Sequence, residues 1–231
     1  INAHYTDPPT VQAMWEIARR LGFKGGRVLE PSMGIGNFFG LMPSDIAEKS
    51  KLAGIELDTL TGGMAKLLYP EANIQIKGYQ ESKIADGFYD LIIGNWPFAK
   101  DGPADRRYRQ INPSLHDYFF LKALDQVRPG GFVIGVTSSG TMDKLGKLTR
   151  LELARKGDLI AAFRLPTGAF EQYAGTAVVT DIIILQKREA PNTSPESTGW
   201  MNVSEVQVSN GAINTNEYWA THPKHVLGEM D

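Results

Sequence analysis

Short apolar runs alternate with amphipathic stretches along this chain. The alternation is typical of an α/β fold in which helices cover both faces of a mostly parallel sheet. The apolar runs predict seven strands, at residues 27–30, 52–56, 73–76, 89–95, 131–137, 159–164 and 178–186. The amphipathic stretches predict helices at residues 10–21, 58–68, 115–127 and 142–156. We therefore expect a Rossmann-like, seven-stranded sheet.

The composition of the chain changes after Arg188. Residues 189–199 (EAPNTSPESTG) are rich in proline, serine and threonine, which predicts a loop or linker. Residues 200–208 could form one more strand, and residues 216–230 a short helical or irregular tail. We expect a domain over residues 1–188 and an appendage over 189–231. Because the chain starts at Ile1 rather than methionine, we expect it to be part of a larger protein.

The overall composition excludes several classes of protein. With 231 residues, 42% of them hydrophobic and 22% charged, the chain can bury the core of one domain. No apolar run approaches the ~18 residues of a membrane span, so we expect no membrane association. Cysteine is absent, which excludes disulfides, thiolate metal sites, iron–sulfur radical chemistry and a cysteine nucleophile, including that of C5-cytosine methylation. A cytoplasmic setting fits this composition.

The net charge of −2 is unevenly distributed. Residues 100–156 contain 11 Lys and Arg against 6 Asp and Glu, so the rest of the chain is acidic. A basic segment of this kind is either a phosphate-facing surface or a solvated helix face.

A glycine-rich turn follows the first predicted strand. This strand ends at Glu30, and Gly34 and Gly36 follow in a G-x-G spacing before a helix. Glycines let the backbone approach a ligand, and a helix N-terminus offers unpaired N–H groups. Glu56 ends the second strand, where a carboxylate can accept both ribose hydroxyls. The pattern predicts a nucleotide-cofactor site, with a purely structural turn as the alternative.

Two cofactor classes fit this turn. Gly34, Gly36 and Gly40 also match a spacing that a dinucleotide site could use. A pyrophosphate, however, is disfavoured by the carboxylate of Glu30-Pro31 directly before the glycines. The same carboxylate suits the cationic end of S-adenosylmethionine (SAM), so the sequence favours SAM.

The fourth predicted strand ends in the segment Asn95-Trp96-Pro97-Phe98. Ligands of open parallel sheets collect at the carboxyl ends of the strands. We therefore expect this loop and the Glu30 turn to face one cleft.

Taken together, these motifs resemble those of SAM-dependent amino methyltransferases, especially the N6-adenine DNA methyltransferases. The resemblance covers roughly residues 4–187 and is closest to methyltransferase domains fused to large phage and plasmid helicases. It rests on the two loops above and on Tyr5-Thr6-Asp7-Pro8-Pro9, which is similar to the segment that closes over the methionine end of SAM. Residues 116–120 and 165–170 are similar to two further family segments.

The resemblance implies a role for each residue of the second loop. The Asn95 side-chain oxygen and the Trp96 carbonyl would accept the two N–H groups of an exocyclic amine, next to Pro97. Phe98 would stack on a flipped base, and Phe170 is either a second stacking partner or a buried loop anchor. SAM would be bound by Tyr5, Thr6, Glu30, Pro31, Gly34, Gly36, Glu56 and Gln80.

The sequence departs from the family pattern at two places. Trp96 stands where the family usually has a proline, which keeps the backbone carbonyl but loses the rigidity of the ring. After the third strand, either Gln80 or Glu81 stands where an acidic residue usually meets the adenine amino group of SAM.

The function that the resemblance implies is N6-adenine methylation of DNA, as in restriction–modification or anti-restriction systems. The alternatives are methylation of guanine N2 in RNA or of a protein glutamine, and a SAM-binding module without turnover. Arg106, Arg107 and Arg109 would contact DNA phosphates. Because three contacts give only weak binding, we expect DNA to be held mainly by further parts of the same polypeptide, a helicase or a target-recognition domain.

Overall fold

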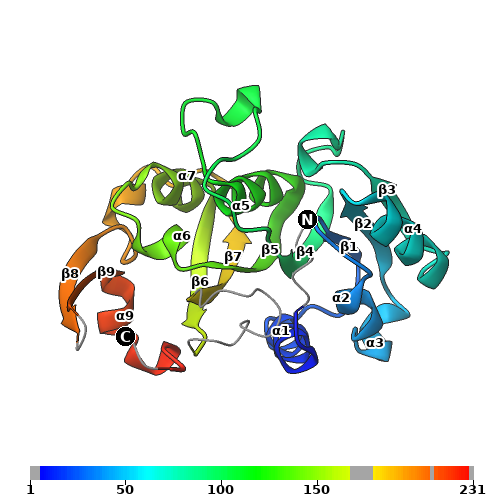
Figure 1. Cartoon of the computed structure of the whole chain (residues 1–231), viewed down its shortest axis with the longest axis horizontal. Coiled ribbons are helices and arrows are strands. Elements are labelled where there is room, and N and C mark those ends of the chain that lie inside the picture. Colours follow the sequence, from blue (N-terminus) through cyan, green and yellow to red (C-terminus); the bar gives the residue numbers. More distant parts are fainter. Residues whose placement is uncertain (1–5, 167–178, 209–210, 229–231) are drawn as a thin grey trace.

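The computed structural model describes residues 6–166, 179–208 and 211–228 and has a seven-stranded sheet at its centre (Figure 1). The strand order is β3-β2-β1-β4-β5-β7-β6, and β7 alone runs antiparallel to its neighbours. The strands are β1 (Arg27–Glu30), β2 (Lys51–Glu56), β3 (Asn73–Ile76), β4 (Tyr89–Asn95), β5 (Val127–Ser138), β6 (Gly157–Arg164) and β7 (Thr180–Lys187). The predicted fold class, a seven-stranded and mostly parallel sheet, is confirmed.

Helices cover both faces of this sheet (Figure 1). In β4, Ile92 belongs to the core beneath one set of helices, whereas Leu91 and Ile93 belong to the core on the other face. Because side chains alternate across a strand, a continuous apolar run is what a sheet buried on both faces requires. The helices are α1 (Pro8–Arg20), α2 (Asn37–Gly40), α3 (Ser44–Ala47), α4 (Thr59–Leu68), α5 (Leu115–Gln126), α6 (Gly140–Asp143), α7 (Leu148–Lys156) and α9 (Glu217–Thr221).

Two helices begin within two residues of their predicted starts, α1 at Pro8 and α4 at Thr59. The Asp7 carboxylate accepts a hydrogen bond from the Thr10 N–H at the start of α1, where Pro8 and Pro9 occupy the first turn. The Asp58 carboxylate accepts from the Thr61 N–H at the start of α4. Both caps satisfy a helix N–H group that would otherwise lack a partner.

The predicted helix over residues 142–156 is wrong in one respect, because α6 and α7 are separate helices. The backbone between them turns at Lys144, which adopts an extended conformation. The Lys144 ammonium pairs with the fully buried Asp117, and the Lys144 carbonyl accepts a hydrogen bond from Arg150 at 2.9 Å. These tertiary contacts replace one turn of helix.

Beyond Arg188 the chain forms a hairpin and packs on the helices. Strand β8 (Val203–Val208) pairs antiparallel with β9 (Gly211–Asn216), so the predicted strand is present over 203–208 and its partner was not foreseen. Trp200 and Trp219 are buried in the core that contains α5 and α7. The division of the chain at residue 188 stays a prediction, although both parts share this core.

Short 3-10 helices connect several of these elements. They are η1 (Tyr79–Glu81), η2 (Arg106–Tyr108), η3 (Pro195–Ser197) and η4 (Pro223–His225). Within the part of the chain that the structure describes, no helix is long and apolar enough to cross a bilayer.

Candidate active site

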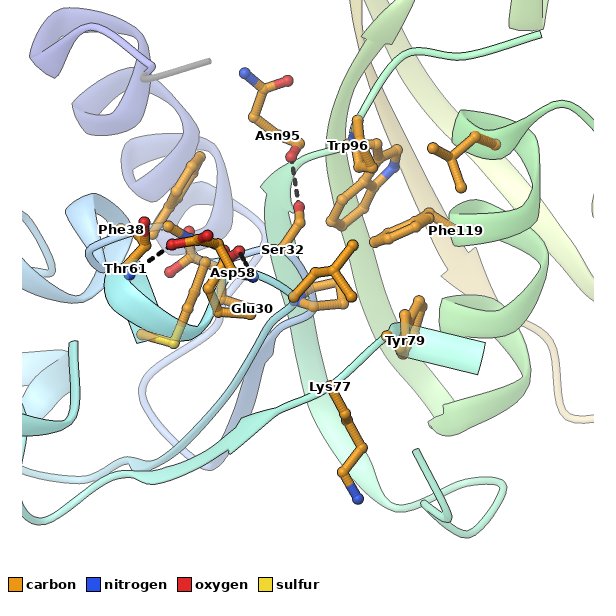
Figure 2. A pocket seen from close by; sticks show the side chains of 18 of the residues that line it. Glu30, Ser32, Phe38, Asp58, Thr61, Lys77, Tyr79, Asn95, Trp96 and Phe119 are labelled. Carbon is orange, nitrogen blue, oxygen red and sulfur yellow. Dashed lines mark hydrogen bonds between the residues drawn. The ribbon is translucent and has the colours of Figure 1, made fainter. Parts of the chain in front are cut away.

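A cavity of about 380 Å³ lies at the carboxyl ends of β1, β2, β3 and β4 (Figure 2). This edge of a parallel sheet is where ligands of such folds bind. The cavity brings together most of the described residues that the sequence assigns to a cofactor or an amine: Thr6, Glu30, Pro31, Gly34, Glu56, Gln80, Asn95, Trp96 and Pro97. Tyr5 and Phe170, two further predicted residues, lie outside the described residues.

Glu30 ends β1 and is only 2% exposed. Its Oε2 atom is buried and has no hydrogen-bond partner among the described residues. Burial, followed by the nearby Glu56 carboxylate, raises the pKa of Glu30 well above the usual range for glutamate. A buried, unpartnered carboxylate is costly unless a cation or a donor pairs with it. The site therefore suits a positively charged ligand group.

Glu56 connects the turn after β1 with the turn after β2. Its Oε2 accepts a hydrogen bond from the Gly34 N–H at 2.8 Å, and its Oε1 accepts from the Asp58 N–H at 2.8 Å. Each carboxylate oxygen can accept a second hydrogen bond, so both remain able to bind a hydroxyl. Gly34 has a φ of 55°, in the left-handed region that glycine adopts freely.

Gly36 is not among the described residues that line the cavity. A Cβ atom at this position would lie 2.4 Å from the Tyr69 ring, and the Tyr69 hydroxyl donates to the Gly36 carbonyl at 2.8 Å. Gly36 also has a φ of 88°. The glycine therefore shapes the turn and allows Tyr69 to pack against it.

The turn after β3 also lines the cavity, through Gln80. The Glu81 carboxylate instead accepts a hydrogen bond from the Gly78 N–H at 2.8 Å within the turn itself. Of the two residues that the sequence left open, Gln80 is thus the one at the cavity.

Asn95 lies at the end of β4, and its Oδ1 atom is buried without a hydrogen-bond partner in the described parts of the chain. Its backbone carbonyl accepts from the Ser32 hydroxyl at 2.7 Å, which joins this loop to the turn after β1 (Figure 2). A buried carbonyl oxygen without a partner is the group that a ligand N–H would satisfy.

The Trp96 indole packs directly against the backbone of two glycines, Gly94 and Gly135, which leave the space that we call the indole socket. Gly94 and Gly135 are cross-strand partners in β4 and β5, and a Cβ atom on Gly135 would lie 2.3 Å from the indole nitrogen. The indole is 1% exposed and packs near Phe119, with ring centroids 5.8 Å apart. The backbone N–H of Trp96 donates to the Val136 carbonyl at 3.0 Å, whereas the buried indole N–H has no partner among the described residues. These contacts fix the backbone where the family has a rigid proline.

Phe98 is not among the described residues that line the cavity, and its ring lies edge-on to His116 at a centroid distance of 6.3 Å. Its predicted stacking on a base stays a prediction. Sequence analysis missed several wall residues, among them Ser32, Tyr79 and Phe119. Ser32 and Tyr79 were marked only by their position after a strand. Phe119 lies in the family-like segment 116–120, but its place on the apolar face of α5 is one that buried core residues share.

The three predicted DNA-contacting arginines lie on the loop between β4 and α5. Arg107 is held in ion pairs with Asp86 at 2.6 Å and with the buried Asp125 at 3.0 Å. Arg106 and Arg109 are exposed and line a second hollow of about 470 Å³ on this loop. The arginines that face outward are therefore Arg106 and Arg109.

Comparison with known proteins supports the Rossmann-like methyltransferase fold. The chain is 31% identical over 200 residues to "Defense against restriction protein B" of Escherichia phage P1, a match that covers 82% of this chain and 8% of that protein. No protein-family model matches the chain.

Two of the solved structures with this fold are subunits of type I restriction systems. A methyltransferase subunit from Streptococcus thermophilus matches with a TM-score of 0.69 and 16% identity, over 96% of this chain and 52% of that chain. A modification subunit of a putative type I restriction enzyme from Vibrio vulnificus YJ016 matches with a TM-score of 0.65 and 18% identity, over 82% of this chain and 45% of that chain. The chain thus spans about half the length of these subunits, and its fold is the methyltransferase fold that the motifs predict.

Proposed function

We propose that this chain is a SAM-dependent methyltransferase domain that acts on the exocyclic N6 amine of adenine in DNA. The observation that carries the proposal is a pair of buried, unpartnered oxygen atoms, Glu30 Oε2 and Asn95 Oδ1, on residues that line one cavity. One suits a cation and the other suits an amine N–H group. The names of the phage relative and of the structural neighbours, which concern restriction and DNA modification, support the same function.

The wall that follows β1, β2 and β3 would bind SAM. Glu30 would pair with the cationic methionine end, Glu56 would accept from the ribose hydroxyls, and Gln80 would contact the adenine ring. SAM supplies an electrophilic methyl group on a positively charged sulfur. The unpartnered Glu30 oxygen and the second acceptor sites on Glu56 fit this cofactor.

The loop after β4 would activate the substrate amine. The nitrogen of an aromatic amine is a poor nucleophile because its lone pair is delocalised into the ring. Asn95 Oδ1 and the Trp96 carbonyl would each accept one N–H group and favour a more tetrahedral nitrogen. The lone pair of a nitrogen held in this way would be free to take up the methyl group that SAM would supply, and one of the two N–H protons would be released to water. Positioning and electrostatics supply most of the acceleration.

DNA would be held only in part by this chain. Two outward-facing arginines, Arg106 and Arg109, neutralise too few phosphates for strong binding, and flipping a base costs a few kcal/mol. We therefore propose that other parts of a larger polypeptide or assembly hold the duplex. The phage relative, of which the aligned segment is 8%, has ample additional chain.

The proposal is tested by methyl transfer from labelled SAM to adenine-containing DNA, with ribosomal RNA and a glutamine-containing protein substrate assayed in parallel. We expect N6-methyladenine in the DNA. The matched variant is Asn95→Ala, which removes an acceptor needed only by the reacting amine. We expect SAM affinity to be nearly unchanged and transfer to be lost.

Three results would contradict the proposal. Transfer by Asn95→Ala at the parental rate would show that the loop is structural. Transfer to RNA or protein alone would assign another substrate, and SAM binding without any transfer would indicate a module without turnover.

A further inference from the structure

The loop over residues 96–114, between β4 and α5, projects from the body of the molecule (Figure 1). Its two limbs are joined by backbone hydrogen bonds from the Gly102 N–H to the Pro113 carbonyl and from the Leu115 N–H to the Ala99 carbonyl, at 3.2 and 3.1 Å. The basic loop, as we call residues 96–114, is therefore closed by these hydrogen bonds, and it carries the exposed Arg106 and Arg109.

The inner side of the basic loop is bound to α5. The Tyr118 hydroxyl donates to Asp105 Oδ2 at 2.8 Å, and the Tyr108 hydroxyl donates to Asp125 Oδ2 at 2.6 Å. Asp105 also caps η2, because its Oδ1 accepts from the Arg107 N–H at 2.9 Å. The orientation of η2 thus depends on where Tyr118 holds Asp105.

The same helix also holds one wall of the cofactor cavity. The Lys122 ammonium donates to the Gln80 carbonyl at 3.4 Å and to the Tyr118 hydroxyl at 3.3 Å. One turn further along, the Gln126 side chain accepts from the Tyr79 hydroxyl at 2.6 Å. Gln80 and Tyr79 both line the cavity.

Tyr118, Lys122 and Gln126 are spaced by four residues and therefore lie on one face of α5. All three are buried, with exposed fractions of 0%, 8% and 2%. A buried hydrogen bond is costly to break because water does not replace the lost partner. This polar stripe forms a continuous connection from Gln80, through Lys122 and Tyr118, to Asp105 and the basic loop.

A second connection runs along the surface. The Arg107 guanidinium donates to both carboxylate oxygens of Asp86, at 2.8 and 2.6 Å, and Asp86 lies in the segment that follows η1. Both residues are about half exposed, so this pair contributes less than the buried stripe.

We infer that Tyr118 and Lys122 are positioning residues that couple cofactor binding at Gln80 to phosphate binding at Arg106 and Arg109. The inference rests on the proposed function. A ligand that fixes the turn over residues 78–81 also fixes, through the polar stripe, the place of the basic loop. By reciprocity, DNA bound to the loop tightens the cofactor site by the same factor.

The test measures DNA affinity of the chain with and without saturating S-adenosylhomocysteine, the unreactive product of SAM. In the unchanged chain we expect this ligand to tighten DNA binding about fivefold or more, the lower end of coupling between two sites. Tyr118→Phe keeps the ring and removes only the hydroxyl, and Lys122→Met keeps the length and removes the ammonium. In both variants we expect the ratio of the two affinities to fall to about one.

The matched control is Tyr218→Phe, which removes another buried tyrosine hydroxyl. Tyr218 accepts from the Ala162 N–H at 3.1 Å, on the part of the fold that contains β6 and α9. We expect its ratio to equal that of the unchanged chain, which separates coupling from a general loss of stability.

The outcomes distinguish the inference from the proposed function. A ratio of one in the unchanged chain, or an unchanged ratio in Tyr118→Phe and Lys122→Met, overturns the coupling and leaves the function intact. If S-adenosylhomocysteine binds but the unchanged chain binds no DNA in either condition, the inference fails, whereas the proposed function is decided separately by the methyl-transfer assay.

Discussion

The wall of the cavity built by β1, β2 and β3 is held together by polar contacts, whereas the wall built by β4 and α5 is held by aromatic packing. On the first wall, Glu56 receives backbone N–H groups from Gly34 and Asp58. On the second, the Trp96 indole fills the space above Gly135 and contacts Phe119. The comparison suggests that the cofactor wall depends on charge and hydrogen bonding and the amine wall on shape.

Gly135→Ala tests whether the amine wall depends on shape, and we expect it to have the largest effect. The added methyl group would overlap the Trp96 indole, so the indole and the adjoining Trp96 carbonyl must move. A displacement of 1 Å at a reacting group can cost about 100-fold in rate. We expect a loss of methyl transfer of this order with little change in SAM affinity, measured by transfer assays and calorimetry.

The matched control for this variant is Gly63→Ala on α4. Apart from its chain neighbours and the backbone of its own helix, no described atom lies within 4 Å of the Cβ that this change adds. Its transfer rate should match that of the parent. Full activity in Gly135→Ala would show that the indole socket does not position the loop.

Glu56→Ala tests whether the cofactor wall depends on hydrogen bonding. The change removes the acceptor of two backbone N–H groups and of the expected ribose hydroxyls. Losing hydrogen bonds to a charged group costs about 1–3 kcal/mol, so SAM should bind more weakly by that amount in calorimetry. Undiminished SAM affinity would remove Glu56 from the site.

Glu30→Gln tests the cost of the buried charge through the pH dependence of stability. The pKa of Glu30 is raised by burial and by Glu56, so the folded chain retains this proton better than the unfolded chain does. The free energy of unfolding of the parent should therefore fall as the pH rises from about 4.3, the unfolded pKa, toward the raised folded pKa. One proton gives a slope of at most about 1.4 kcal/mol per pH unit.

The glutamine variant should lack this decrease. Without cofactor it should be more stable than the parent at neutral pH, with a difference that disappears below the unfolded pKa, and it should bind SAM more weakly. Urea unfolding across this pH range measures the effect, with the exposed Glu71→Gln as the control. A parent and variant that lose stability in parallel would show that Glu30 is paired in solution.

The smallest effect is expected from the double variant Arg106→Ala/Arg109→Ala. Each phosphate contact contributes about 0.9 to the slope of log affinity against log salt, so the slope should decrease by about 1.8. SAM affinity should not change. Lys51→Ala, at the opposite end of the sheet, is the single-site control, and a decrease of about 0.9 in its slope would argue against a specific phosphate surface.

The polar wall could largely be predicted from the sequence, and the aromatic wall could not. Glu30 and Glu56 end apolar strands, and the carboxyl ends of parallel strands meet at one edge of the sheet. The Trp96 socket depends instead on the register that places Gly94 beside Gly135, a long-range pairing that no local pattern encodes. For the same reason, the contacts that separate α6 from α7 at Lys144 were missed.

The sheet order has a consequence for how the chain folds during synthesis. Strands β1 to β4 can complete the half of the sheet that surrounds the cavity before any later strand is needed. Strand β5 then lacks its second neighbour, because β7 lies between β5 and β6 and begins only at Thr180. Translation adds roughly 5–20 residues per second, so the edge of β5 stays unpaired for about 2 to 8 s until β7 has been synthesised. The unpaired N–H and C=O groups of such an edge can pair with a strand of another chain. Slower translation of the segment between β5 and β7 should therefore increase aggregation during expression.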